Sequence, residues 1–275
     1  MAKAKVFVIY YSTYGHVQTL AQAVMKGLLK SGKVDAEIYQ ISETLSDDVL
    51  EKMNAAEKLN VPEITADRLV EADGFVFGFP TRFGTAPAQV KAFFDSTGKL
   101  WSQGALAGKP VGLFFSTASQ HGGQEATAFS FMPHFAHHGM VYVSLGYPSD
   151  KMRDNSAVMG GSPWGCGTVA GPNGERTPQV SELDIATIQG EKFAVVAAKL
   201  AAPAPVPAPA PATDQAAAPA AAQAEAQAEA PAPTEQGKAQ QGAGAQQTAA
   251  QEPPAKRESG GRVKKAVAKI KSLFS

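Results

Sequence analysis

A strand that passes directly into a helix lies near the start of the chain and constrains the fold more than any other feature. The uncharged run Val6-Phe-Val-Ile-Tyr10 predicts a buried strand of a parallel sheet. Apolar residues at helical spacing follow it and predict one buried helix face: Val17, Leu20, Ala21, Val24 and Leu28. Parallel strands need a crossover connection, and a helix usually supplies it. This first unit therefore predicts an α/β fold.

The turn between that strand and helix, Tyr11-Ser-Thr-Tyr-Gly-His16, has the composition of an anion site. The first N–H groups of a helix lack partners and the helix dipole favours negative charge there, while Ser12 and Thr13 add hydroxyl donors. The turn contains no Lys or Arg, and it matches neither the GxxxxGK[ST] loop nor the GxGxxG motif. These features favour a phosphate held by dipoles and hydroxyls, such as that of FMN. The alternative is an ordinary strand–helix turn capped by a serine.

Strand and helix patterns alternate through the next 170 or so residues. Further strands are predicted at 36–41, 74–79, 111–115 and 140–144, and helices at about 87–96, 126–138 and 184–200. This alternation predicts a doubly wound parallel sheet with helices on both faces. In such sheets ligands bind beyond the carboxyl ends of the strands. The expected ligand loops are therefore 12–16, 80–85 and 116–123.

Composition divides the 275-residue chain into three parts. Residues 1–200 have 17 basic against 19 acidic side chains and are long enough for one folded domain. Residues 201–261 are mostly Ala, Pro, Gln and Glu, which predicts a disordered linker. The near-neutral domain gives no case for a nucleic-acid surface. A single cysteine, no signal peptide and no apolar run of about 20 residues favour a cytoplasmic protein.

The last segment, 262–275, is basic and patterned. Val263, Val267, Ile270 and Phe274 share one helical face, and lysines occupy mostly the others. This predicts a short amphipathic helix that binds an anionic membrane or a partner's groove, which would place the protein peripherally at the inner face of the plasma membrane. The alternative is a disordered solubilising tail.

Six short motifs in order give the chain a family resemblance over roughly residues 4–200. They are Ser12-Thr-Tyr-Gly-His16, Pro80-Thr-Arg-Phe-Gly84, Gly98-Lys-Leu-Trp101, Gly122-Gly-Gln-Glu125, Ala136-His-His-Gly139 and Gly160-Gly-Ser-Pro-Trp-Gly165. Together they resemble the WrbA family of flavodoxin-like NAD(P)H:quinone oxidoreductases. The resemblance implies a five-stranded flavodoxin-like fold, bound FMN, a homotetramer built as a dimer of dimers, and two-electron reduction of quinones to hydroquinones by NADH or NADPH. It also implies protection against semiquinones and oxidative stress.

The resemblance implies flavin contacts from three loops. The third loop is one residue longer than the bacterial form of the motif, with Gln120-His121 where that form is nearly all Gly and Thr. The cofactor-binding residues predicted on this basis are Ser12, Thr13, Tyr14, Gly15, His16, Val17, Thr81, Arg82, Phe83, Gly84, Ser116, Thr117, Ala118, Ser119, Gln120, His121, Gly122 and His138.

The resemblance also implies three residues beside the substrate. Trp101 would form a flat apolar wall at the mouth of the site, and Tyr14 would line the same pocket. His138 would face the flavin pocket, either that of its own chain or that of a neighbouring subunit. Its imidazole could donate a hydrogen bond or a proton to a reduced quinone oxygen. For each of these residues an ordinary packing or surface role is the alternative.

His134, His137 and His138 share one helix face and raise the alternative of a metal site. No carboxylate or cysteine stands at ligand spacing beside them, and the family uses no metal. We therefore predict no metal site.

For the quinone oxidoreductase we expect ping-pong kinetics, because both substrates would use one slot over the flavin. Two other classes of function stay open beside this enzyme. One is a flavodoxin-type electron carrier, against which the near-neutral charge and the insertions at 42–67 and 147–187 speak. The other is a peripheral membrane-organising protein in which the flavin domain is the oligomeric body.

Overall fold

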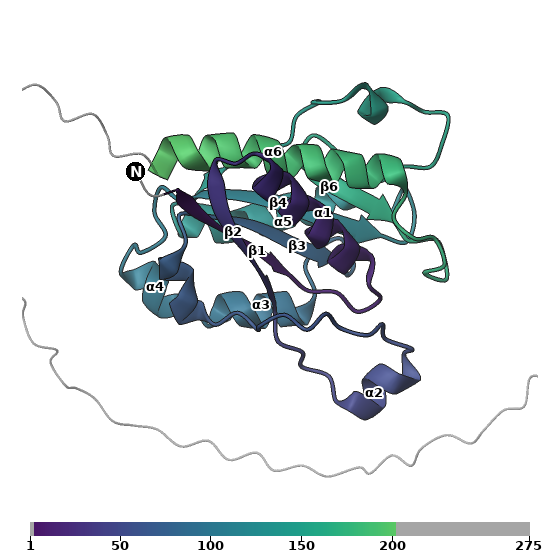
Figure 1. Ribbon diagram of the computed structural model, residues 1–275. Helices are drawn as coiled ribbons and strands as arrows, with labels where there is room; N and C mark the ends of the chain where they lie inside the picture. The colour runs from purple at the N-terminus through teal and green to yellow at the C-terminus, as the bar shows by residue number, and fades with distance from the viewer. Residues whose placement is uncertain (1–2, 202–275) are drawn as a thin grey trace, which may run out of the picture. The chain divides into compact units, whose positions relative to one another are not determined.

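The computed structural model describes residues 3–201, and these form a parallel sheet between two layers of helices (Figure 1). The strand order is β2-β1-β3-β4-β5, and β6 also pairs with β4. The strands are β1 (Ala4–Tyr10), β2 (Val34–Gln40), β3 (Gly74–Pro80), β4 (Pro110–Thr117), β5 (Val141–Tyr142) and β6 (Gly165–Val169). The helices are α1 (His16–Lys30), α2 (Asp47–Lys52), α3 (Ala88–Asp95), α4 (Gly98–Ser102), α5 (Gln124–His137) and α6 (Val180–Ala201), with short 3-10 helices at Ala66–Glu71 and Asp150–Arg153. The predicted doubly wound α/β class is confirmed.

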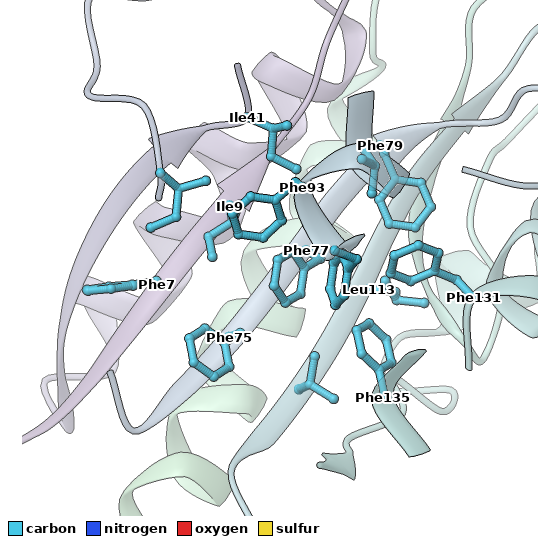
Figure 2. Packing of buried hydrophobic residues seen from close by; sticks show 14 of the residues in the cluster. Phe7, Ile9, Ile41, Phe75, Phe77, Phe79, Phe93, Leu113, Phe131 and Phe135 are labelled. Carbon is cyan, nitrogen blue, oxygen red and sulfur yellow. The ribbon is translucent and has the colours of Figure 1, made fainter. Parts of the chain in front are cut away.

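The two faces of the sheet carry different cores. Alternate residues of β1 point to opposite faces, so Val6 and Val8 pack with α1 and α6, whereas Phe7 and Ile9 face α3 and α5. The second face is rich in phenylalanine, as Figure 2 shows. Its rings lie in contact, for example Phe79 against Phe131 with centroids 4.7 Å apart. Aromatic pairs of this kind add about 0.5–1.5 kcal/mol each beyond their buried area.

The helices α1 and α6 approach closely because glycine stands at their crossing. A β-carbon on Gly27 would lie 2.0 Å from the Thr187 carbonyl oxygen, and one on Gly190 would lie 2.2 Å from that of Val24. Each glycine therefore makes room for the backbone of the other helix.

The fifth position of the sheet is shared by two strands, which corrects the predicted count of five. The predicted strand at 140–144 covers only Val141–Tyr142, which pairs with the first residues of β4. The chain then leaves the sheet and returns as β6, which pairs with Leu113–Thr117. β6 was not predicted from the sequence, because glycines interrupt the pattern of apolar residues that indicates a strand. Gly165 is required there, since a β-carbon would lie 2.1 Å from the Leu113 carbonyl oxygen.

Cys166, the single cysteine of the chain, lies inside β6, and its side chain is fully buried. Burial raises the pKa of its thiol.

Most helix predictions are confirmed with shifted ends. The helix predicted at 126–138 begins at Gln124, and the last helix begins at Val180 rather than 184. Within residues 3–201 no helix is long and apolar enough to cross a membrane. Except for Ala201, which ends α6, the predicted linker 201–261 lies outside the described residues, as does the predicted amphipathic helix 262–275.

Candidate functional site

A cleft of about 580 Å³ opens at the carboxyl ends of β1, β3, β4 and β6. The structure therefore brings the three predicted ligand loops together, as the topology rule requires. The cleft is lined by Ser12, Thr13, Tyr14, His16, Val17, Met53, Asn54, Ala56, Pro80, Thr81, Arg82, Ser116, Thr117, Ala118 and residues 170–174. Its volume lies within the range usual for cofactor pockets.

The first loop presents the amino terminus of α1 to the cleft. Gly15 has a φ of 84°, a left-handed conformation that lets the chain turn sharply before His16 starts the helix. The Ser12 hydroxyl oxygen accepts a hydrogen bond from the Gly15 amide at 3.1 Å. The first helical hydrogen bond runs from the Thr19 amide to the Gly15 carbonyl oxygen. Ser12 shapes the loop, and no side chain caps the amino terminus of α1, so the first amides of the helix are available to a ligand.

The second loop contributes Thr81 and Arg82 to the cleft but not Phe83 and Gly84. Arg82 and Thr85 exchange two backbone hydrogen bonds across a tight turn. Phe83 lies in this turn with a φ of 54° and a fully exposed side chain. A phenylalanine rarely adopts positive φ, so the turn holds this ring outward at a cost in backbone strain. Neither Phe83 nor Gly84 lines the cleft of one chain, and their contact with the cofactor stays a prediction.

The third loop turns away from the cleft after Ala118. The Thr117 hydroxyl donates to the Ser119 carbonyl oxygen at 2.7 Å, and the Gly122 amide donates to the same oxygen. Gln120 instead lines a separate polar pocket with Glu125 and Lys151. Ser119, Gln120, His121 and Gly122 do not line the cleft of one chain, and the cofactor contacts predicted for them stay predictions.

Trp101 and His138 lie in a second pocket of about 310 Å³, not at the mouth of the cleft. This pocket is formed by α3, α4 and α5 and includes Phe94, Pro133 and His134. Trp101 is 55% exposed there. The predicted site of quinone and nicotinamide stacking is thus divided between two separate pockets of a single chain.

The His138 side chain is hydrogen-bonded to Thr97. The Thr97 hydroxyl lies 2.6 Å from the Phe94 carbonyl oxygen and 2.8 Å from Nε2 of His138. Which of the two groups donates between Thr97 and His138 depends on the tautomer of the imidazole. Nδ1 is buried with no partner among residues 3–201. Burial, followed by the charges of His134 and His137, lowers the pKa of His138. Burial thus favours the neutral imidazole, and the donation of His138 to a quinone oxygen stays a prediction.

The described residues hold no group of three or more His, Cys, Asp or Glu side chains placed to bind a metal ion. The Phe131 ring stacks on His134 at 4.3 Å. Phe94 meets both His134 and His138 edge to face. Within one chain, His134 thus packs against the rings of Phe94 and Phe131, and His138 packs against the ring of Phe94.

Two parts of the cleft wall come from the insertions at 42–67 and 147–187. Residues 170–174 follow β6, and the insertion supplies Met53, Asn54 and Ala56. The Ala56 amide fastens this insertion to the first loop by donating to the Thr13 carbonyl oxygen at 2.9 Å. The Gly171-Pro-Asn-Gly174 run is a recognisable turn signal, but its position beside the cleft depends on β6.

A buried ion pair holds the 170–174 wall. The Glu182 carboxylate is fully buried and accepts from Nη1 of Arg176 at 3.0 Å. It also accepts from the Gly160 amide and the Thr168 hydroxyl, both at 2.8 Å. The Arg176 amide donates to the Ala170 carbonyl oxygen, which closes the loop at its base. The wall is therefore fixed by interactions behind it.

The electrostatics of the cleft suit an anion. Among the described residues that line it, Arg82 carries the one formal charge and none is a carboxylate. The Arg82 guanidinium donates to the Thr13 hydroxyl at 3.1 Å and to the Thr81 carbonyl oxygen at 2.9 Å. Arg82 is thus a cation held between the first two loops rather than a free surface charge. Together with the α1 amino terminus, it favours a phosphate and a reduced, negatively charged ring system.

Comparisons with known proteins agree with this arrangement. The sequence profile of the family described as NADPH-dependent FMN reductase matches residues 4–153. A quinone oxidoreductase, QR2, of Triphysaria versicolor is 53% identical over 197 residues, which cover 71% of this chain and 96% of that protein. The NAD(P)H quinone oxidoreductase YCP4 of Candida albicans is 50% identical over 199 residues, 71% of this chain and 69% of that protein.

Among solved structures, a flavodoxin-fold WrbA-like protein from Agrobacterium tumefaciens matches with a TM-score of 0.50 and 25% identity. The match covers 72% of this chain and 99% of that protein. The chain belongs to the FMN reductase family and, within it, to the WrbA-type quinone oxidoreductases.

Proposed function

We propose that this protein is an FMN-dependent NAD(P)H dehydrogenase that reduces quinones to hydroquinones by two electrons. The observation that carries this proposal is the cleft, which combines the amino terminus of α1, the cation Arg82 and no lining carboxylate. The relatives named as quinone oxidoreductases support the choice of quinones as acceptors.

The residues of the cleft fit FMN. The amides at the start of α1 and the Ser12 hydroxyl would hold the phosphate. The backbone of Thr81 and Arg82 and of Ser116–Ala118 would border the ring, with Tyr14 at the opening. FMN, when bound, supplies the two-electron chemistry between nicotinamide and quinone. The chain itself contributes an anion-binding end, a positive edge and a confined slot.

An absorbance experiment tests this function. Purified protein is reconstituted with FMN, and its spectrum is recorded before and after addition of NADH or NADPH and then of benzoquinone. Flavin bands that bleach with the nicotinamide and return with the quinone are expected. Bound flavin that neither nicotinamide reduces would contradict the enzyme and favour the electron carrier or the membrane-organising protein.

The donor and the acceptor use the same slot in turn. The cleft of about 580 Å³ would hold the flavin, and we expect one face of the bound ring to take a single flat guest. Ping-pong kinetics follow, with parallel lines in double-reciprocal plots of initial rates. Intersecting lines would contradict a shared slot. A two-electron path that leaves no free quinone radical also fits the expected protection against oxidative stress.

A homotetramer completes the site. Trp101 is half exposed, and the pocket that it shares with His138 lies apart from the cleft of its own chain. In the tetramer that pocket faces the cleft of a neighbouring protomer, where the Trp101 ring supplies the flat wall and His138 holds its shape. Mixed oligomers of Trp101→Ala and Arg82→Met chains should regain activity that each variant lacks alone. Mixed oligomers of verified composition that stay inactive would contradict a shared site.

The segment 262–275 is a separate proposal that rests on its sequence pattern. Its basic residues would bring the enzyme to anionic membranes. Sedimentation with phosphatidylserine vesicles should fall when residues 262–275 are deleted, while quinone reduction stays constant. Equal sedimentation of both proteins would contradict membrane binding by this segment.

A further inference from the structure

Three polar side chains connect the cleft to a carboxylate behind it. Arg82 donates to the Thr13 hydroxyl at 3.1 Å, and Thr13 lies 3.4 Å from the Tyr11 hydroxyl. The Tyr11 hydroxyl lies 3.0 Å and 3.2 Å from the two carboxylate oxygens of Glu43. Thr13 and Tyr11 are both buried. We call this set the Arg82–Glu43 chain.

Arg82 and Glu43, at the two ends of the Arg82–Glu43 chain, determine which group donates in each of its hydrogen bonds. A guanidinium can only donate, and an ionised carboxylate can only accept. Burial of Glu43 favours the neutral acid. The amides of Thr44 and Leu45, with the side chains of Tyr11 and Gln89, outweigh it and lower the pKa of Glu43 below its usual range. Glu43 is therefore ionised at neutral pH.

It follows that both hydroxyls donate toward Glu43. The Tyr11 proton is directed at the carboxylate, so the Tyr11 oxygen is the acceptor that remains for Thr13. The Thr13 proton then points away from the cleft, and its oxygen accepts from Arg82. Thr13 has no second proton with which to bind a phosphate.

We propose that Thr13 is a positioning residue that fixes Arg82, and that Glu43 and Tyr11 anchor it. This inference deepens the proposed function, on which it rests. It replaces the expectation that Thr13, like Ser12, donates to the FMN phosphate. Ser12 differs because its oxygen accepts from the Gly15 amide and its proton is free for a ligand. The two adjacent hydroxyls of the first loop thus have different roles. Ser12 binds the phosphate, and Thr13 positions the guanidinium of Arg82 beside it.

The Arg82–Glu43 chain also places the negative charge of Glu43 behind the positive charge of Arg82. Arg82 is oriented before a ligand arrives, so its side chain loses less freedom on binding. Its second guanidinium contact, to the Thr81 carbonyl oxygen, is made to the loop that would border the ring. The Arg82–Glu43 chain therefore joins the two ligand loops to the insertion that contains Glu43.

Tyr11→Phe tests the proposal, since it removes the acceptor for Thr13 without touching the cleft. We measure the dissociation constant of FMN by titrating the apoprotein and following flavin fluorescence. The expected effect is a weakening on the order of fivefold, the equivalent of one lost hydrogen bond. An unchanged constant in folded Tyr11→Phe protein would overturn the proposal. Absence of FMN binding by the wild-type protein would instead overturn the proposed function.

Tyr39→Phe is the matched control. The Tyr39 hydroxyl also donates to a carboxylate, that of Glu37, and an arginine, Arg68, lies 5.0 Å from its ring. Burial, followed by the neighbouring carboxylate, raises the pKa of Tyr39 to about 12, and burial raises that of Tyr11 equally. This set does not line the cleft. Tyr39→Phe should leave FMN binding unchanged, and an equal loss in both variants would overturn the proposal.

A double-mutant cycle with Arg82→Met separates positioning from direct binding. If Thr13 acts through Arg82, Thr13→Val and Tyr11→Phe should weaken FMN binding in the wild type and have no further effect in Arg82→Met protein. If Thr13 donates to the phosphate, Thr13→Val should weaken binding equally in both backgrounds, which overturns the proposal. The Thr13→Val arm keeps the test decisive where Tyr11→Phe fails to fold.

Discussion

At the scale of single residues, the Arg176–Glu182 pair shows why position rather than charge decides the worth of an ion pair. Glu182 is fully buried, and its oxygens take up five donors from four segments. Without Arg176 the carboxylate would remain buried with its charge uncompensated. Breaking a buried pair in this way costs about 3–5 kcal/mol.

We therefore expect Arg176→Ala to lower the free energy of unfolding by about 3 kcal/mol or more, measured by urea titration. Arg153→Ala is the control, because Arg153 pairs with Asp150 at 2.8 Å on the open surface. That variant should unfold like the wild type. Equal stability of both variants would show that the buried pair is not what holds the 170–174 wall.

At the scale of elements, the crossing of α1 and α6 is set by two glycines. Gly27 and Gly190 both lie within helices, where glycine is otherwise less favourable than alanine by about 1 kcal/mol. Their retention in this chain is explained by the near contact of each with the other helix's backbone.

Gly27→Ala should consequently destabilise the protein by about 1–3 kcal/mol despite the better helix propensity, because the two helices must move apart. The melting temperature in a calorimetric scan is the measurement. Gly98→Ala is the matched control, since a β-carbon there meets no atom within 4 Å. A gain in stability for Gly27→Ala would mean that the helices separate at no cost.

At the scale of the whole molecule, the pH dependence of stability follows from two histidines at the end of α5 and from a carboxylate in the 42–67 insertion. Burial lowers the pKa of His134 and His138 from the usual 6.5. Hydrogen bonds, outweighing burial, lower the pKa of Glu43 from the usual 4.5. In each case the unfolded chain binds a proton more readily than the folded one, so stability is lost as the pH falls.

The free energy of unfolding should decrease in two stages on acidification, below about pH 6.5 for the histidines and below about pH 4.5 for the carboxylate. Urea titrations across this range measure it. Replacing both His134 and His138 by glutamine should remove the first stage and leave the second. A first stage that persists in this double variant would assign it to other groups.

The first strand, turn and helix of the chain show which elements can be predicted from the local spacing of apolar residues. The strand, the turn and the helix from Val6 to Leu28 were predicted from apolar spacing, and the structure has them with shifted ends. The same holds for β3 and β4, which are short, uncharged and flanked by turn residues. β6 could not be predicted this way, because Gly165 and Gly167 serve a neighbouring backbone rather than a periodic pattern.

The site residues also fall into those whose position could be predicted and those whose position could not. That Ser12, Thr81 and Ser116 would meet in one cleft follows from the parallel topology, which places the carboxyl ends of all strands at one edge. That Trp101 and His138 would lie in another pocket depends on how α4 and α5 pack, and no local pattern contains this.

The parallel α/β class, the glycine and hydroxyl turn before α1 and the family could be predicted without a structure, because they depend on residue order and local spacing. The direction of the Thr13 proton, the link that Arg82 makes between the first two loops and the separate pocket of Gln120 required the folded chain. These properties depend on partners that lie far away in the sequence. A hydroxyl takes its direction from the charges at the ends of its hydrogen bonds, and here Glu43 and Arg82 supply them across 39 residues of sequence.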